Sequence, residues 1–74
     1  MHTIAAELVA NVHTVLVHEG DSVGPTDTLV ILESMKMEIP VLAEVSGVVS
    51  ELAVAPGDVI REGDVIAVIE EAQP

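Results

Sequence analysis

Apolar residues occur in short runs along the chain, and clusters of glycine, proline and acidic residues separate these runs. The turn signals fall at residues 19–21, 24–27, 56–58 and 62–64. Between them lie segments of about five or six residues, the usual length of a β-strand. Residues 28–32 (TLVIL) and 65–69 (VIAVI) are continuous apolar runs that are rich in β-branched residues and short for a helix. We therefore interpret both as strands.

Residues 5–12 (AAELVANV) are the one segment whose apolar spacing also permits a turn or two of helix. The segment has neither an N-cap box at its start nor a glycine stop at its end, so the sequence favours a strand here as well. The pattern as a whole predicts an all-β fold.

The second half of the chain repeats the first with an offset of 37 residues. Identical residues fall at Ala6 and Ala43, Glu7 and Glu44, Val12 and Val49, Val17 and Val54, Gly20 and Gly57, Asp21 and Asp58, Asp27 and Asp64, and Glu33 and Glu70. We expect two half-repeats, at about 4–33 and 41–70, that pack their aliphatic faces together about a pseudo-twofold axis.

The segment that joins the two halves contains Lys36, the only lysine in the chain, between Met35 and Met37. A residue at a tight connection between two β-units is accessible from outside, so we expect Lys36 at an exposed hairpin. The alternative is an ordinary solvated lysine, the usual fate of this residue type. Its uniqueness, its methionine neighbours and its position at the junction count against that alternative.

Composition limits the classes of function. The 74 residues are enough for one domain, 1–74, and include 26 Val, Ile or Leu but no aromatic residue and no cysteine. Disulfides, thiolate nucleophiles and zinc–sulfur sites are excluded. The formal charge of −11 repels phosphate backbones and anionic lipids, so we expect no nucleic-acid or membrane partner. The charge either steers the chain toward a basic protein or keeps an apolar domain dispersed.

No catalytic or metal site is predicted. His2, His13 and His18 do not have the spacing of a metal-ligand set. The four serines lie in no recognisable arrangement with a histidine and a carboxylate. The N-terminal segment lacks the features of a secretory signal, and no apolar run is long enough to cross a membrane, so we expect a cytoplasmic protein.

The segments ESMKMEIPVLAEVSGVV (33–49) and VAPGDVIREGDVIAVI (54–69) closely resemble the biotinyl, or biotin carboxyl carrier, domain. The Met-Lys-Met triplet is the specific part, because related lipoyl domains more often have Asp-Lys-Ala at this turn. The resemblance extends from about residue 7 to residue 70, and it is strongest to the free-standing biotinylated, or biotin attachment-like, proteins of actinobacteria.

The resemblance implies a flattened barrel of two four-stranded antiparallel sheets with the modified lysine at a hairpin tip. By the same resemblance, Lys36 is the biotin-accepting lysine, and Met35 and Met37 are its flanking recognition residues. Gly47 matches the glycine that opens the second repeat. Thr26 stands where the family more often has glycine, and the chain lacks the insertion that forms a protruding thumb in some acetyl-CoA carboxylase carriers.

The implied function is that of a carrier without catalytic residues of its own. A biotin ligase would attach biotin covalently to Lys36, and the carrier would then take carboxybiotin from a biotin carboxylase to a carboxyltransferase, as in acyl-CoA carboxylases. We expect a monomer. Two alternatives remain open: a lipoyl-bearing carrier of a 2-oxo acid dehydrogenase system, and an interaction module that carries no cofactor.

Overall fold

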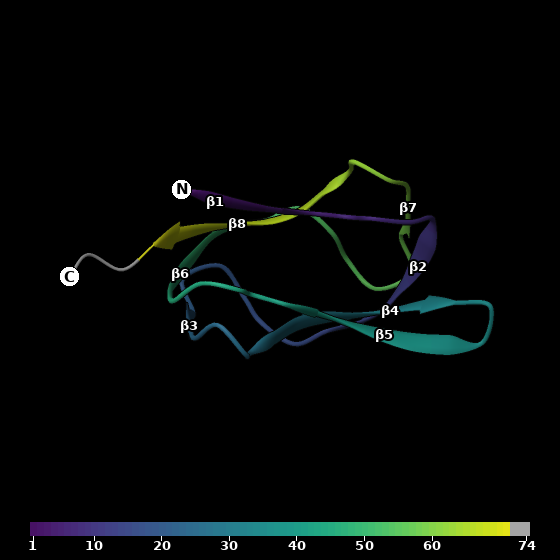
Figure 1. Ribbon diagram of the computed structural model, residues 1–74, viewed down its shortest axis with the longest axis horizontal. Coiled ribbons are helices and arrows are strands. Elements are labelled where there is room, and N and C mark those ends of the chain that lie inside the picture. Colours follow the sequence, from purple (N-terminus) through teal and green to yellow (C-terminus); the bar gives the residue numbers. More distant parts are fainter. Residues whose placement is uncertain (72–74) are drawn as a thin grey trace.

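The computed structural model describes residues 1–71, which contain eight β-strands and no helix. The strands are β1 (His2–Ala5), β2 (Ala10–Val15), β3 (Ser22–Val23), β4 (Thr28–Ser34), β5 (Met37–Leu42), β6 (Gly47–Leu52), β7 (Val59–Ile60) and β8 (Val65–Glu71). They form two four-stranded antiparallel sheets, in the orders β1-β8-β6-β3 and β5-β4-β2-β7. In Figure 1, β1 and β8 run along the upper layer and β4 and β5 along the lower layer. The predicted fold class is confirmed.

The internal repeat is a symmetry of the fold. An offset of 37 residues places β2 on β6, β3 on β7 and β4 on β8 with identical bounds, and it places β1 inside β5. Applied to the strand order, the offset converts one sheet into the other: β1-β8-β6-β3 becomes β5-β4-β2-β7. Each sheet therefore contains strands from both halves of the chain, so neither half forms a sheet by itself.

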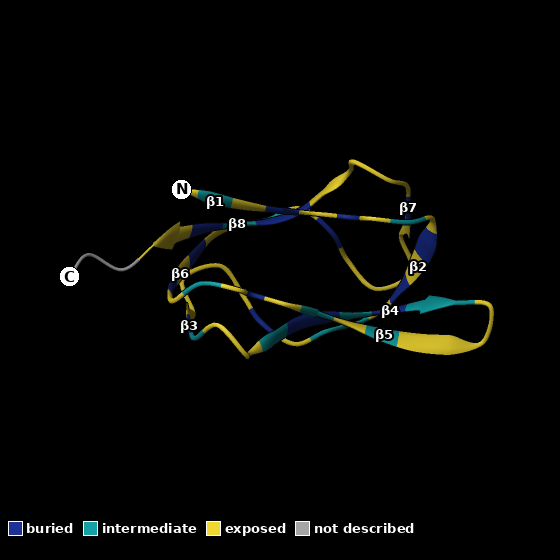
Figure 2. Cartoon of the chain, in the orientation of Figure 1, coloured by how far each residue is buried: buried dark blue, intermediate teal, exposed yellow. Residues whose placement is uncertain are grey.

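The core between the sheets consists of aliphatic side chains that the repeat places in matching pairs. The pairs that are buried at both positions are Ala6 and Ala43, Val12 and Val49, Val17 and Val54, Val23 and Ile60, Leu29 and Ile66, Val30 and Ala67, and Leu32 and Ile69. Figure 2 shows this buried interior along the facing strands. Full burial of one such valine, leucine or isoleucine contributes roughly 1.5–3 kcal/mol. Together these side chains allow a small core without aromatic residues to hold the domain together.

The repeated aspartates close the turns and also join the two halves. Each carboxylate accepts a hydrogen bond from the backbone N–H three residues earlier, at 2.8 Å for Asp21 and Asp27 and 2.9 Å for Asp58 and Asp64. The backbone carbonyl of Asp58 also accepts from Val12 N at 2.8 Å, and that of Asp21 accepts from Val49 N at 2.9 Å. A turn in one half is therefore fixed to a strand of the other half. The carboxylate bond inside each turn explains why aspartate recurs at these positions.

Gly47, the first residue of β6, lies against the backbone of β8. A Cβ at this position would lie 2.1 Å from the carbonyl oxygen of Glu70, which is far inside van der Waals contact. Ala10 holds the equivalent place in the first half, where a Cβ is accommodated. Glycine is thus required at Gly47 by the close approach of two backbones, and its φ is not among the positive values of the chain.

Two local features of the first half concern points raised by the sequence: the helical alternative for residues 5–12, and Thr26 in place of a glycine. Residues 7 and 8 form a bend before β2, and the segment 5–12 contains no helix. Thr26, the counterpart of Gly63, keeps a negative φ, whereas Gly63 has a φ of 91°. At the Gly63 turn, Gly63 N donates a hydrogen bond to the backbone carbonyl of Ala6. At the Thr26 turn, the corresponding link is a hydrogen bond from Glu44 N to the backbone carbonyl of Pro25 at 2.9 Å. Residues 72–74 of the predicted domain 1–74 lie outside the described residues.

Candidate functional site: the Lys36 hairpin

Lys36 lies in the turn that connects β4 to β5, the strands on either side of the junction between the half-repeats. Ser34 pairs with Met37 in the antiparallel register, which leaves Met35 and Lys36 as a two-residue loop. Their φ angles are 52° and 66°, both left-handed. Positive φ at both central residues is the signature of a type I′ turn, whose twist matches that of the flanking strands.

The amino acids in this turn are not those that its backbone prefers. Type I′ turns favour Asn-Gly or Asp-Gly, because a left-handed backbone costs other residues about 1–2 kcal/mol each. Residues held in such conformations are found preferentially at functional sites, where the surrounding structure fixes them. Here the paired residues of β4 and β5 extend from Ser34 and Met37 back to Thr28 and Leu42 and hold the turn in place.

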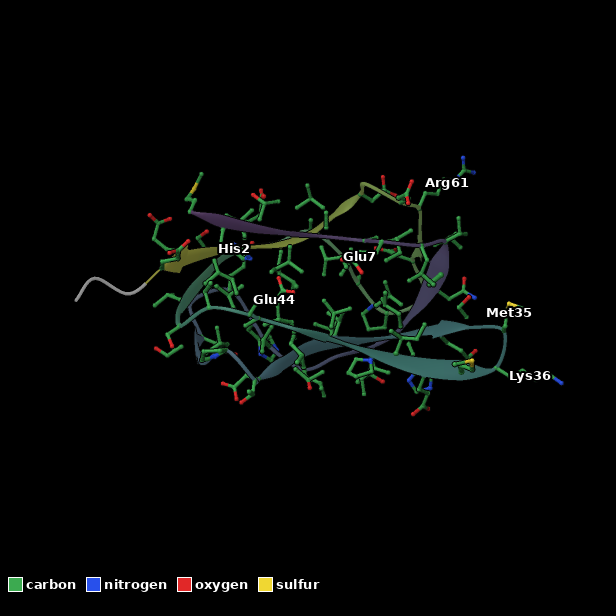
Figure 3. All side chains as sticks on the ribbon, in the orientation of Figure 1. His2, Glu7, Met35, Lys36, Glu44 and Arg61 are labelled. Atoms are coloured by element: carbon green, nitrogen blue, oxygen red, sulfur yellow. The ribbon has the colours of Figure 1, made fainter. Side chains whose placement is uncertain are left out.

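The hairpin tip, which we define as Met35, Lys36 and Met37, is open to solvent. Met35 is 91% exposed and Met37 is 63% exposed, and Lys36 is also in the exposed class. Figure 3 shows the side chains of Met35 and Lys36 pointing away from the body of the domain, at the end opposite the N-terminus. Neither methionine is part of the buried core.

Carboxylates lie near the tip without pairing with the lysine. Glu33 and Glu38 are direct partners across the hairpin, one register pair below Ser34 and Met37. Glu38 Oε2 lies 4.0 Å from Nε2 of His13 on β2. Within residues 1–71, no carboxylate oxygen lies within 4.0 Å of Lys36 Nζ. The amine can thus be acylated without the loss of a specific ion pair.

The three histidines are distributed over separate parts of the domain. His2 Nε2 lies 3.3 Å from Glu44 Oε1 (both residues are labelled in Figure 3), and His18 Nδ1 lies 3.8 Å from Asp21 Oδ2. In the described part of the chain, no group of three or more His, Cys, Asp or Glu residues could hold a metal ion. Residues 1–71 contain no helix with the length and hydropathy needed to cross a membrane.

A groove of about 450 Å³ runs between β1 and β5, over the core residues Ile4, Leu32 and Ile66. None of the three tip residues lines it. The geometry around Lys36 is therefore that of a side chain presented on a rigid hairpin. It suits covalent attachment of a group that must visit other proteins, because the group would be held by a bond and not by an enclosing pocket.

Comparison with known proteins assigns the family. The family model described as "Biotin-requiring enzyme", for biotin and lipoyl domains, matches residues 3–69. The biotinylated protein TB7.3 homolog of Mycobacterium leprae (strain TN) is 62% identical over 66 residues, which cover 89% of this chain and 93% of that protein.

Solved structures agree with this assignment. A single-chain, multi-domain long-chain acyl-CoA carboxylase matches with a TM-score of 0.89 and 30% identity, over 96% of this chain and 7% of the enzyme. The lipoyl domain of the 2-oxoglutarate dehydrogenase complex from Azotobacter vinelandii matches with a TM-score of 0.78 over 95% of this chain and 99% of that domain. At 24% identity, the second match supports the fold alone.

The chain belongs to the biotin and lipoyl attachment domain family. Within this family it is a biotin carboxyl carrier-type domain, homologous to the biotinyl domains of acyl-CoA carboxylases. The predicted family, its carrier function and biotin as its cofactor are thereby confirmed at the level of the family. The left-handed backbone of Met35 and Lys36 was not predicted, because neither residue type signals it.

Proposed function

We propose that Lys36 is the residue to which biotin is covalently attached and that the chain carries the attached cofactor between the active sites of a biotin-dependent carboxylase. The observation that carries the proposal is the position of the only lysine of the chain, exposed at the tip of a two-residue hairpin. The family assignment supplies the kind of group that such a lysine would hold.

The hairpin would contribute position and access. A biotin ligase presents the biotin carboxyl group as a mixed anhydride with AMP. The Lys36 amine would attack its carbonyl carbon, with loss of a proton from nitrogen and departure of AMP, so that an amide bond forms. The reaction removes the positive charge of Lys36 and changes the formal charge from −11 to −12. Within the described residues, no carboxylate pairs with the amine. The ligase would therefore have to displace only water from the amine on its two-residue turn.

Met35 and Met37 are proposed as the surface that the ligase recognises around the lysine. Both thioethers are exposed, on either side of Lys36. Methionine is flexible and polarisable, which suits a contact that forms only when a partner binds. Their exposure supports this role, because side chains that served only the core would be buried.

Bound biotin would supply the ureido group that accepts and donates carboxylate, so the chemistry resides in the cofactor and the partner enzymes. We propose that the chain itself is not an enzyme. Tethering raises the effective concentration of the cofactor at each active site in turn. The partners would be a biotin ligase, a biotin carboxylase and a carboxyltransferase. The first two consume ATP, which makes the cytoplasm the expected compartment.

We further propose that residues 1–74 form one domain that acts as a monomer. Three of the four edge strands support this proposal. β3 and β7 are only two residues long, and the edge strand β5 contains Pro40, which has no N–H to offer a neighbouring strand. Short edges and proline are features that discourage pairing between sheets of different molecules.

The proposal is tested by incubating the purified chain with biotin, ATP and a biotin ligase and mapping the modified residue by tandem mass spectrometry. Biotin on Lys36 is the expected result. Attachment of biotin at another position, such as the N-terminal amine, would refute the assignment. A parallel reaction with a lipoate ligase examines the alternative. If only the lipoate ligase modified the chain, the attached cofactor would be lipoate and not biotin.

A further inference from the structure

Oxidisable side chains are concentrated around Lys36. The chain has three methionines and no cysteine, tryptophan or tyrosine. Thioethers are therefore the groups that a peroxide would oxidise most readily in this protein. Two of the three methionines are the immediate neighbours of the only lysine.

The exposure of these thioethers makes them accessible to a small oxidant. Met35 is 91% exposed and Met37 is 63% exposed. Met1 is 82% exposed but lies at the N-terminal end, remote from the β4–β5 hairpin (Figure 1). Met1 thus provides an internal reference: it should oxidise about as readily, but with no consequence for Lys36.

We propose that Met35 and Met37 form a redox-sensitive control on the acylation of Lys36, an inference that rests on the proposed function of that lysine. In the chemical step, a peroxide transfers one oxygen atom to the thioether sulfur. The sulfur is oxidised by two electrons to the sulfoxide, and the peroxide is reduced to water or an alcohol. Methionine sulfoxide reductases reverse the modification.

The expected effect follows from the change in polarity on both sides of the amine. A thioether is apolar and soft, whereas a sulfoxide is polar and accepts hydrogen bonds. We expect the ligase to acylate the oxidised domain more slowly by about tenfold, as when one polar group is left without a partner in an apolar contact. The fold itself should not change, because neither sulfur belongs to the buried core.

The experiment treats the purified apo-domain with hydrogen peroxide, removes the peroxide, and follows biotinylation by a biotin ligase with intact mass spectrometry. Cleavage after glutamate then separates residues 1–7 from residues 34–38, because Glu7, Glu33 and Glu38 delimit these peptides. The expected result is slow biotinylation when the 34–38 peptide carries sulfoxides, and recovery of the original rate after treatment with both sulfoxide reductases. The thermal midpoint should be unchanged by oxidation.

Met35→Leu, Met37→Leu and the double variant serve as controls, each compared with its own untreated rate. The double variant keeps only Met1, which is remote from Lys36, so its rate should not respond to peroxide. The inference is overturned if peroxide leaves Met35 and Met37 unoxidised, if the oxidised parent is biotinylated at the untreated rate, or if the double variant slows as much as the parent. Absence of biotin on the untreated parent would instead refute the proposed function, and this inference with it.

Discussion

Replacement of Gly47 by alanine should destabilise the domain strongly without altering the chemistry of the hairpin tip. The added Cβ would lie 2.1 Å from the carbonyl oxygen of Glu70 and 2.8 Å from its carbonyl carbon. Close contacts between carbon and a carbonyl oxygen are normally about 3.3 Å or longer, so β6 and β8 would have to separate locally by roughly 1 Å. Both neighbours are backbone atoms, which cannot rotate away as a side chain could.

The magnitude follows from the contacts that this separation disrupts. Overpacking in a close-packed region costs about 1–3 kcal/mol, and each backbone hydrogen bond lost near the Gly47–Glu71 pair costs about 1 kcal/mol. We therefore expect the free energy of unfolding to fall by about 2–4 kcal/mol. A domain of this length has a total of roughly 4–11 kcal/mol. At about 4–8 °C for each kcal/mol, the thermal midpoint should fall by about 8–32 °C.

Far-ultraviolet circular dichroism during thermal and urea unfolding is the appropriate assay, because the chain has no tryptophan or tyrosine fluorescence. Gly20→Ala is the matched control: its Cβ would meet no atom within 4 Å, but its φ is 96°. The free energy of unfolding of this control should fall only by the cost of placing alanine in a left-handed backbone, about 1–2 kcal/mol. A Gly47→Ala midpoint within about 3 °C of the parent, with an unchanged urea dependence, would refute the steric argument.

Three further changes examine the core, the turns and the hairpin. Leu32→Ala, at a side chain that is 1% exposed, should lower the free energy of unfolding by about 2–5 kcal/mol in urea titrations, and a loss below about 1 kcal/mol would contradict its place in the core. Asp21→Ala and Asp58→Ala should each cost about 1 kcal/mol, through loss of equivalent turn hydrogen bonds; markedly unequal losses would argue against the symmetry. Met35→Gly should raise the thermal midpoint, because glycine removes a left-handed backbone penalty of about 1–2 kcal/mol. Part of this gain is offset, because glycine also increases the conformational entropy of the unfolded chain. A lower midpoint would show that the turn is unstrained.

Most of the fold could be predicted from the sequence because the same pattern occurs twice. The offset of 37 residues that aligns Asp21 with Asp58 also aligns three pairs of strands with identical bounds. These aspartates recur because the carboxylate of each accepts the hydrogen bond that closes its turn. The uniqueness of Lys36 pointed to the junction, and the structure places this residue at the tip of the hairpin there.

Other features could not be predicted because they depend on contacts between distant segments. Met35 and Lys36 lack the Asn-Gly signal of a type I′ turn, and it is the register of β4 and β5 that imposes their left-handed backbone. The reason for glycine at position 47 becomes visible only when β8 lies beside it. The helical alternative for residues 5–12 arose from local apolar spacing, which tertiary pairing overrides.

The central claim is that the single lysine at the hairpin tip carries biotin. Its most direct test is intact mass spectrometry of the parent chain and Lys36→Arg after co-expression with an active biotin ligase. Arginine keeps the positive charge and the exposed position, so both chains should unfold at the same temperature. We expect a single biotinyl increment on the parent and none on the variant. An unmodified parent beside a ligase that biotinylates a known carrier, or an equal increment on both chains, would contradict the account.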